Sequence, residues 1–200
     1  MLRSLVGSEM CIRDRPKGVP QASYRKVGIL GAGMMGAGIA FCAAEVGMDV
    51  VLLDSSTHSA ARGKSYSEGL WNKRVASKRM TEAERDAKLA RIKPTTEFAD
   101  LAGCDIVVEA VFEDRAVKAD VTRKAEAVIA HSAIFASNTS TLPISGLAEA
   151  SARPANFIGL HFFSPVDKMP LVEIIRGQAT SDECLARACL LYTSPSPRDS

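Results

Sequence analysis

The chain has 200 residues, a formal net charge of +2, 46% hydrophobic residues and 24% charged residues. This length and composition indicate a globular protein with a sizeable core, and the near balance of charges argues against a nucleic-acid or membrane-surface partner. No apolar run reaches the roughly 18 residues of a membrane-spanning helix, and no signal peptide is recognisable, so we expect a cytoplasmic protein without a membrane span.

The two ends of the sequence look foreign to the rest. Residues 5–15 (LVGSEMCIRDR) and 189–199 (CLLYTSPSPRD) can be encoded by opposite strands of one short DNA, which two unrelated natural peptides should not allow. We therefore expect residues 1–15 and 189–200 to be translated sequencing adapter, the alternative being two natural disordered tails. On this interpretation the natural chain continues past both junctions. Residues 16–24, which contain proline and glycine, are expected to form a linker.

Cysteine usage gives no indication of a metal site. Outside the two tails the cysteines are Cys42, Cys104 and Cys184, and none of them forms a CxxC pair or a cluster with histidine. All three lie in or near apolar stretches, so we expect reduced, structural thiols.

A glycine-rich loop follows the first predicted strand, residues 26–30 (KVGIL). A helix is predicted at residues 37–46, after the loop, and a second strand at residues 49–53 (DVVLL). The loop sequence GAGMMG has the G-x-G-x-x-G spacing that allows a tight turn, a close approach of a pyrophosphate and close packing of helix on strand. We expect the loop to contact a dinucleotide through Gly31, Gly33, Met34, Met35 and Gly36.

Asp54 directly follows the second predicted strand and completes this pattern. A carboxylate there can accept hydrogen bonds from both hydroxyls of a ribose and would repel a 2′-phosphate, so NAD is favoured over NADP. The alternative is a tight turn that binds no nucleotide.

The stretch from residue 59 to residue 93 is charged and helical. We predict helices at residues 60–79 and 82–90, separated by a break near Thr81, where the sequence TEAE has the pattern of a capping box. This pair of helices is therefore an insertion after the second strand.

The third predicted strand, residues 105–108, leads into the sequence EAVFEDRAVK and a helix at residues 116–130. Glu113 and Lys118 fall in the loop and the first helical turn, at the carboxyl end of a strand, where open α/β sheets bind ligands. Either side chain could contact the cofactor, but a solvated acidic cap followed by a surface lysine explains the sequence equally well.

Hydroxyl and amide side chains follow the next predicted strand, residues 133–136. The sequence SNTSTLP includes Asn138 and Ser140 and is suited to orienting a polar substrate. A short helix is predicted at residues 144–150.

The last predicted elements complete a regular alternation of strands and helices. Strands are predicted at residues 157–162 and 171–175, and a helix begins at residue 180. The alternation predicts an α/β fold of the Rossmann type, with a doubly wound, mostly parallel sheet and a helical insertion after the second strand.

The final two strands carry a candidate acid–base pair. His161 lies at the end of the first, and Glu173 lies within LVEII in the second. A buried carboxylate is costly unless it is paired, so we expect Glu173 to hold the imidazole of His161. Such a pair fixes the tautomer and stabilises the imidazolium that forms when the other nitrogen takes a proton. A lone histidine at a strand end is more often structural, and the glutamate is what favours catalysis here.

Four motifs in this order, GILGAGMMGAGIA, VVEAVFEDRAVK, IFASNTSTLPI and IGLHFFSPVDKMPLVEII, resemble the NAD-binding domain of L-3-hydroxyacyl-CoA dehydrogenases. The resemblance is strongest to the α subunits of bacterial multifunctional fatty-acid oxidation complexes. It implies an NAD-binding domain at residues 25–180 and the start of a C-terminal helical domain at residues 181–188.

The resemblance also implies residue roles. By position, His161 matches the general base, Glu173 its orienting carboxylate, and Ser140 the hydroxyl that hydrogen-bonds the substrate oxygen. Many relatives have asparagine where this chain has Ser164, and serine reaches less far toward a substrate. Cofactor contacts are expected at Asp54, Glu113, Lys118 and Asn138.

The helical insertion matches the part of the family fold near which the CoA moiety lies. Its basic side chains suit CoA phosphates, although a merely solvated basic face fits them at least as well. These residues are Arg62, Lys64, Lys73, Arg74, Lys78 and Arg79.

The implied function is NAD-dependent oxidation of L-3-hydroxyacyl-CoA to 3-ketoacyl-CoA in fatty-acid β-oxidation, by a homo-oligomer or by a complex with a thiolase subunit. One alternative is a catalytically inactive NAD-binding module, which predicts damage at His161, Glu173 or Ser140. Another is a 3-hydroxybutyryl-CoA dehydrogenase that works in the reductive direction. Because the domain that follows in relatives is incomplete here, we expect this fragment to bind NAD and to turn over poorly.

Overall fold

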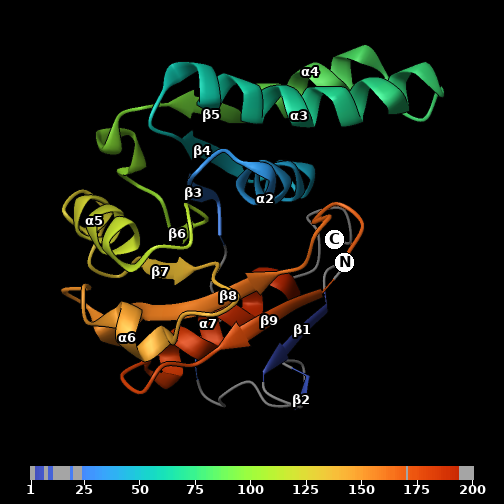
Figure 1. The fold of residues 1–200 in the computed structure, drawn as a ribbon. Coiled ribbons are helices and arrows are strands. Elements are labelled where there is room, and N and C mark those ends of the chain that lie inside the picture. Colours follow the sequence, from blue (N-terminus) through green and yellow to red (C-terminus); the bar gives the residue numbers. More distant parts are fainter. Residues whose placement is uncertain (1–2, 7–8, 11–18, 20–23, 170, 194–200) are drawn as a thin grey trace.

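A computed structural model describes residues 3–6, 9–10, 19, 24–169 and 171–193. The predicted α/β architecture is confirmed: one twisted sheet carries helices on both faces (Figure 1). Seven of its strands, in the order β5-β4-β3-β6-β7-β8-β9, form a mostly parallel sheet. Their bounds are β3 Lys26–Leu30, β4 Asp49–Leu53, β5 Ile92–Thr95, β6 Ile106–Glu109, β7 Ile134–Ser137, β8 Phe157–Phe162 and β9 Leu171–Ile175.

The direction of the strands changes at the side of the sheet that β9 forms. The pairs from β5 through β8 are parallel, as expected for strands joined by helical crossovers, whereas β9 runs antiparallel to β8. Two short strands extend the sheet beyond β9: β1 (Arg3–Val6) lies parallel to β9, and β2 (Glu9–Met10) pairs with β1. These strands belong to the segment that we expect to come from adapter DNA. That expectation concerns the origin of the sequence and stays a prediction.

The other parts of the terminal segments fall largely outside the described residues. Of the linker predicted at residues 16–24, only Val19 and Tyr24 are described. Near the carboxyl end, α7 (Asp182–Thr193) continues past residue 188 into the predicted adapter segment.

The helices lie where the sequence predicts them; α4 has the predicted bounds, and the other helices have shifted ends. Their bounds are α2 Met34–Glu45, α3 Thr57–Ala76, α4 Glu82–Ala90, α5 Arg115–Glu126 and α6 Ile144–Ala148. The helix predicted from residue 37 begins earlier, inside the glycine-rich loop, because helical geometry starts as soon as Gly33 has turned the chain. The capping box at Thr81 is confirmed, with reciprocal bonds between Thr81 and Glu84. No described helix has the length and apolar character needed to cross a membrane.

Strand β5 is missing from the sequence prediction. It contains Pro94, which cannot donate a ladder hydrogen bond and so lowers the strand signal of IKPT. The strand tolerates proline because it lies at the edge of the sheet, with β4 as its one described neighbour.

Two apolar clusters cover the two faces of the sheet. Successive residues of β3 and β4 point to opposite faces, so Ile29 and Leu52 belong to one cluster and Leu30 and Val51 to the other. Helices α2 and α7 cover the first face, and α5 and α6 cover the second. Trp71 of α3 is fully buried against the first cluster and attaches the helical insertion to α2.

The carboxyl ends of the parallel strands meet at one edge. Leu30, Glu109, Ser137 and Gly159 lie opposite one another in neighbouring strands. The glycine-rich loop, the loop before α5 and the loop after β7 therefore all leave the sheet at the same edge, which is where open α/β sheets bind ligands.

Candidate active site

The glycine-rich loop is tightly packed at two of its glycines and open at the third. Gly31 has a φ of +93°, and a Cβ atom there would lie 2.6 Å from the carbonyl oxygen of Ala110. A Cβ atom on Gly36 would lie 1.7 Å from the carbonyl oxygen of Gly31. At Gly33 no described atom lies within 4 Å of a Cβ position, and α2 begins at the next residue. The loop therefore leaves space at the amino end of α2, where unpaired N–H groups attract phosphate.

Asp54, directly after β4, holds this loop through a hydrogen bond. Its Oδ2 accepts a hydrogen bond from the backbone N–H of Ala32 at 2.7 Å, and its Oδ1 accepts from the backbone N–H of Ser55 at 2.7 Å. The Ser55 hydroxyl also donates to Oδ1, at 3.1 Å. A carboxylate offers about four lone-pair directions, so Oδ2 can still accept from a ribose hydroxyl, and Oδ1 can do so when the Ser55 hydroxyl turns away. The half-buried Asp54 and the space at Gly33 thus fit the adenosine and pyrophosphate parts of NAD.

A buried ion cluster lies between β6 and α5. The Lys118 ammonium contacts Oε1 of Glu109 at 2.8 Å and Oε2 of Glu113 at 3.2 Å. Lys118 and Glu109 are each 1% exposed, so the alternative of a surface lysine is wrong: the helix turns Lys118 inward, onto the end of β6. Burial raises the pKa of Glu109, while Lys118 and the Ser137 hydroxyl act in the opposite direction.

Glu109 is a site residue that the sequence interpretation missed. The available signal was a carboxylate at the end of an apolar strand, the same signal that singled out Glu173.

Glu113 binds the turn that follows β7 through hydrogen bonds. Its Oε1 accepts hydrogen bonds from the hydroxyl of Thr139 and from the backbone N–H groups of Ser140 at 3.1 Å and Thr141 at 3.3 Å. Partial burial acts to raise the pKa of Glu113, but the hydrogen bonds from Thr139 and Lys118 and the charge of Lys118 outweigh it and lower the pKa to about 2. Glu113 is therefore a carboxylate at neutral pH, held between α5 and the turn.

The structure brings His161 and Glu173 together. The two residues are directly opposite in the antiparallel ladder of β8 and β9, and Nδ1 of His161 lies 3.2 Å from Oε2 of Glu173. The expectation that Glu173 is buried is wrong, because its side chain is 44% exposed. Alternation along β9 sends Val172 and Ile174 into the core and Glu173 to the other face, beside His161.

Of the remaining predicted residues, Asn138 contacts the strand that carries His161, and Ser164 and Met35 lie at or near the glycine-rich loop. The amide oxygen of Asn138 accepts from the backbone N–H of Phe162 at 2.9 Å, which ties the loop after β7 to the strand of His161. Ser140 is exposed on its turn. Ser164 is exposed as well, and its hydroxyl lies 3.8 Å from the sulfur of Met34. Met35 is half-buried against the core.

The three cysteines expected to be structural are not part of this site. Cys104 and Cys184 are buried, Cys42 is half-buried, and all three are unbridged. Burial raises the pKa of the Cys42 and Cys184 thiols to about 12 and that of Cys104 to about 11, so none is a reactive thiolate at neutral pH. Across the described stretches, no group of three or more His, Cys, Asp and Glu side chains could hold a metal ion.

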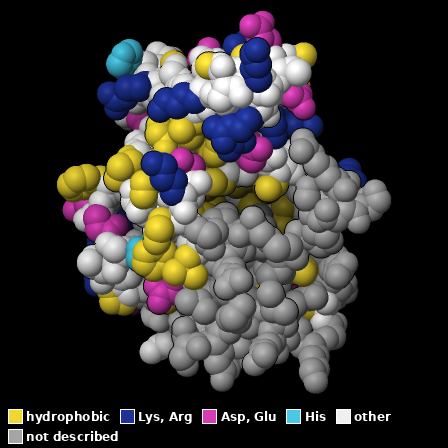
Figure 2. Space-filling model, turned by 90° about the vertical axis from the view of Figure 1, so that its right-hand side faces the viewer, with side chains coloured by type: hydrophobic (Ala, Val, Ile, Leu, Met, Phe, Trp, Pro, Cys, Tyr) yellow, Lys and Arg dark blue, Asp and Glu magenta, His cyan; other side chains and the backbone are white. Residues whose placement is uncertain are grey.

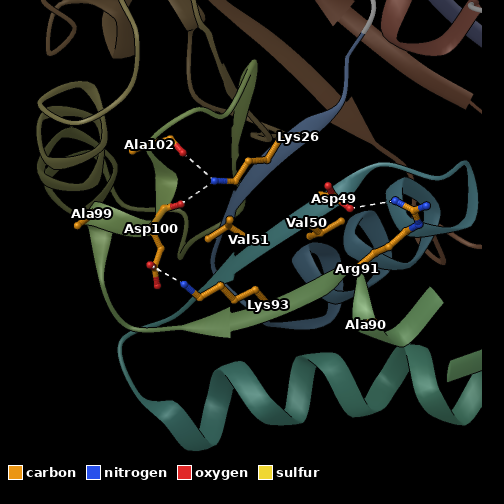
Figure 3. A pocket seen from close by; sticks show the side chains of 10 residues that line it. All are labelled: Lys26, Asp49, Val50, Val51, Ala90, Arg91, Lys93, Ala99, Asp100 and Ala102. Atoms are coloured by element: carbon orange, nitrogen blue, oxygen red, sulfur yellow. Dashed lines mark hydrogen bonds and ion pairs between the residues drawn. The ribbon is translucent and has the colours of Figure 1, made fainter. Parts of the chain in front are cut away.

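A surface hollow of about 550 Å³ lies at the opposite edge of the sheet, near the amino ends of β3 and β4 (Figure 3). Its polar groups already have partners: the Lys26 ammonium donates to the backbone carbonyl oxygens of Asp100 and Ala102, and Lys93 and Arg91 pair with Asp100 and Asp49. The groups that line the hollow therefore contact one another, and the hollow lies apart from the glycine-rich loop.

Basic side chains gather on the helical insertion. Figure 2 shows Lys and Arg side chains over the upper part of one face, where Figure 1 places α3 and α4. Arg62, Lys73, Lys78 and Arg79 are exposed, whereas Arg74 is half-buried and pairs with Glu45.

Comparison with known proteins agrees with this geometry. Residues 26–195 match the model of the family described as "3-hydroxyacyl-CoA dehydrogenase, NAD binding domain". The chain is 45% identical over 163 residues to a protein of Acinetobacter baylyi named fatty acid oxidation complex subunit alpha, and 44% identical to its namesake in a Psychrobacter species. Each match covers 82% of this chain and 23% of the relative, so the chain spans about a quarter of the length of these relatives.

Solved structures show the same similarity. The (S)-3-hydroxybutyryl-CoA dehydrogenase PaaH1 from Ralstonia eutropha superposes with a TM-score of 0.81 at 40% identity, covering 85% of this chain and 60% of that one. The 3-hydroxybutyryl-CoA dehydrogenase from Escherichia coli gives a TM-score of 0.82 at 33% identity, covering 86% and 36%.

Proposed function

Because the chain belongs to the family of 3-hydroxyacyl-CoA dehydrogenase NAD-binding domains, we propose that it is the nucleotide-binding part of an enzyme that oxidises L-3-hydroxyacyl-CoA to 3-ketoacyl-CoA. The observation that carries the proposal is the contact of His161 with Glu173, 3.2 Å apart at the edge of the sheet where the glycine-rich loop also lies. A nucleotide site and a base oriented by a carboxylate are what alcohol oxidation by NAD requires.

Each residue of the proposed site has a separate role in binding or in proton transfer. Gly33 and the amino end of α2 receive the pyrophosphate, and Asp54 accepts from the ribose hydroxyls. Bound NAD supplies the acceptor for the hydride that leaves the 3-carbon. The Nε2 atom of His161 takes the proton of the 3-hydroxyl group, while Glu173 holds Nδ1–H and stabilises the resulting imidazolium. The Ser140 hydroxyl donates a hydrogen bond to the substrate oxygen.

The cofactor-facing roles of the other loops belong to the same proposal. Met34 and Met35 flank the nucleotide at the start of α2, and Asn138 meets it from the loop after β7. Glu113 and Lys118 act from the buried cluster, where both already have protein partners. Ser164, exposed beside Met34, faces the substrate.

The larger setting is inferred from the relatives. The parent protein works in fatty-acid β-oxidation, because the curated relatives are named as subunits of a fatty acid oxidation complex. We place it in the cytoplasm as part of the same proposal. It assembles with a thiolase subunit or as a homo-oligomer, and the basic face of α3 receives the phosphates of an acyl-CoA. We further propose that residues 1–15 and 189–200 are adapter-derived, that residues 16–24 are a linker, and that residues 181–188 begin a second, helical domain.

A 3-hydroxybutyryl-CoA dehydrogenase that works in the reductive direction is the second candidate, and the names of the two solved relatives favour this substrate without giving a direction. The same base and the same cofactor site serve both directions of the reaction, since His161 returns on reduction the proton that it takes on oxidation. An inactive binding module is disfavoured, because His161, Glu173 and Ser140 are all present.

The proposal is tested by His161→Ala in the full-length natural protein. Loss of the base should lower acetoacetyl-CoA-dependent oxidation of NADH by about 100-fold or more and leave the dissociation constant for NADH unchanged. His58→Ala, an exposed position on α3, is the matched control and should change neither quantity. Retained activity in His161→Ala would rule out His161 as the base. A wild-type protein that does not bind NADH would overturn the cofactor assignment.

A further inference from the structure

The proposed chemistry makes no use of the carboxylate of Glu109, although this group lies in the middle of the site. Glu109 ends β6, between Leu30 of β3 and Ser137 of β7 in the register of the sheet. The glycine-rich loop follows the first of these neighbours, and the loop with Asn138 and Ser140 follows the second. Glu109 is thus fixed between the two loops to which we assign cofactor and substrate binding.

Both oxygens of this carboxylate are engaged. Oε1 accepts from the Lys118 ammonium at 2.8 Å and from the backbone N–H of Val111 at 2.8 Å, and Oε2 accepts from the Ser137 hydroxyl at 2.7 Å. A buried ion pair contributes little net stability compared with packed apolar side chains of the same size. Its place beside the proposed ligand-binding loops therefore indicates that the ion pair holds neighbouring groups in position.

A continuous chain of contacts leads from Glu109 to the turn that carries Ser140. Lys118 bridges Glu109 to Oε2 of Glu113 at 3.2 Å, and Oε1 of Glu113 accepts from the N–H groups of Ser140 and Thr141. We infer that Glu109 is a positioning residue: through Lys118 it fixes Glu113, and Glu113 sets the place of the 139–141 turn. This inference rests on the proposed function only for what the turn does once it is in place.

Glu109→Gln removes the charge and keeps the shape of the side chain. The amide oxygen can still accept from Lys118. Among the described residues, Glu113 is then the carboxylate that remains in contact with the ammonium. The buried ammonium is then drawn toward Glu113, and Glu113 is drawn away from the N–H groups of the turn. The turn should loosen while the rest of the sheet keeps its structure.

Amide hydrogen exchange, measured by NMR on the 200-residue chain, tests this coupling. In Glu109→Gln the amides of Ser140 and Thr141 should exchange about tenfold faster than in the wild type. Ser137→Ala is the matched control, because it removes a hydrogen bond to the same carboxylate and leaves the contacts of Lys118 and Glu113 in place. Both variants should have a lower Tm, but the control should not change the exchange of the two amides.

The affinity for NADH supplies a second measurement. It should fall by about tenfold in Glu109→Gln and stay unchanged in Ser137→Ala, as expected when a supporting partner of a binding group is removed. Equal exchange rates in the wild type and Glu109→Gln, or equal acceleration in both variants, would overturn the positioning role. If the wild type failed to bind NADH, the proposed function would fail, and the exchange rates would still decide on Glu109.

A substitution at the exposed end of the chain of contacts covers the case in which Glu109→Gln does not fold. Glu113→Gln changes a side chain that is 33% exposed, so folding is less at risk. Because coupling is reciprocal, the amide signal of Val111, which donates to Glu109, should shift in this variant. An unmoved Val111 signal would contradict the inference.

Discussion

At the scale of single residues, the site depends on side chains that meet because neighbouring elements pack together. His161 and Glu173 meet because β8 and β9 pair in one antiparallel register. The sequence predicts this pairing but not the exposure of Glu173, since an apolar run such as LVEII does not reveal which of the two faces of a strand is covered. Lys118 is a similar case, because its burial depends on the packing of α5 against β6.

Glu173→Gln tests the orienting role of the carboxylate. The amide can still meet the imidazole but no longer stabilises its charged form, so kcat of the full-length protein should fall by about 10- to 100-fold. The affinity for NADH should be unchanged. Steady-state kinetics with acetoacetyl-CoA measure the loss, and Glu149→Gln, at an exposed position after α6, is the control. A variant as active as the wild type would show that His161 needs no partner.

The low pKa of Glu113 predicts how stability depends on pH. Its pKa is lowered from an ordinary value of 4.5 to about 2, so the folded state favours the ionised form. The stability that Glu113 contributes is therefore present above about pH 4.5 and is lost as the pH falls toward 2. Urea unfolding between pH 7 and pH 2 should show a smaller acid-induced loss of stability in Glu113→Gln than in the wild type. In Glu68→Gln, at an exposed position on α3, the loss should equal that of the wild type.

At the scale of elements, local signals explain most of the fold. Apolar runs with the length of buried strands locate β3, β4, β8 and β9 to the residue, and the TEAE sequence locates the start of α4. Strand β5 is missed because Pro94 weakens its signal, although the edge of a sheet tolerates proline. The start of α2 is misplaced because glycine propensity argues against helix, whereas the packing of Gly36 on Gly31 requires it.

The glycine-rich loop predicts opposite outcomes for one substitution made at two positions. Gly36→Ala places a methyl group 1.7 Å from the carbonyl oxygen of Gly31, so strand and helix must separate and the Tm should fall sharply. At Gly33 no described atom lies within 4 Å of the added methyl group, so Gly33→Ala should fold normally but bind NADH at least about tenfold more weakly. Thermal unfolding and NADH titration separate the two effects. A Gly33→Ala variant with wild-type affinity would show that the nucleotide does not approach there.

At the scale of the whole molecule, the sheet separates two edges with different properties. The carboxyl edge collects the glycine-rich loop, the buried ion cluster and the pair of His161 with Glu173. The amino edge holds the hollow in which Arg91 and Lys93 form ion pairs with Asp49 and Asp100. The alternation of strands and helices predicts which edge binds ligands, because parallel strands must all end on the same side. The contact between Glu109 and Lys118 is not predictable in this way, since it depends on how α5 sits on the sheet.

The exposure of the proposed catalytic pair predicts weak turnover by the 200-residue chain. The His161 side chain is 23% exposed and that of Glu173 is 44% exposed, so water reaches the groups that a closed active site would shield. The chain should bind NADH yet oxidise it with acetoacetyl-CoA at least about 100-fold more slowly than the full-length natural protein. Absorbance at the NADH band measures both rates. Equal rates would mean that these residues already form the complete active site.

The position of Asp54 has a consequence for redesign of the coenzyme preference. One of its oxygens holds the N–H of Ala32, and we assign the same carboxylate to the ribose hydroxyls. A substitution that admits a 2′-phosphate therefore also removes a brace of the glycine-rich loop. A switch to NADP consequently needs at least two changes made together, one that accepts the phosphate and one that supplies a new acceptor for Ala32. A single substitution at Asp54 should weaken binding of both coenzymes before it improves binding of either.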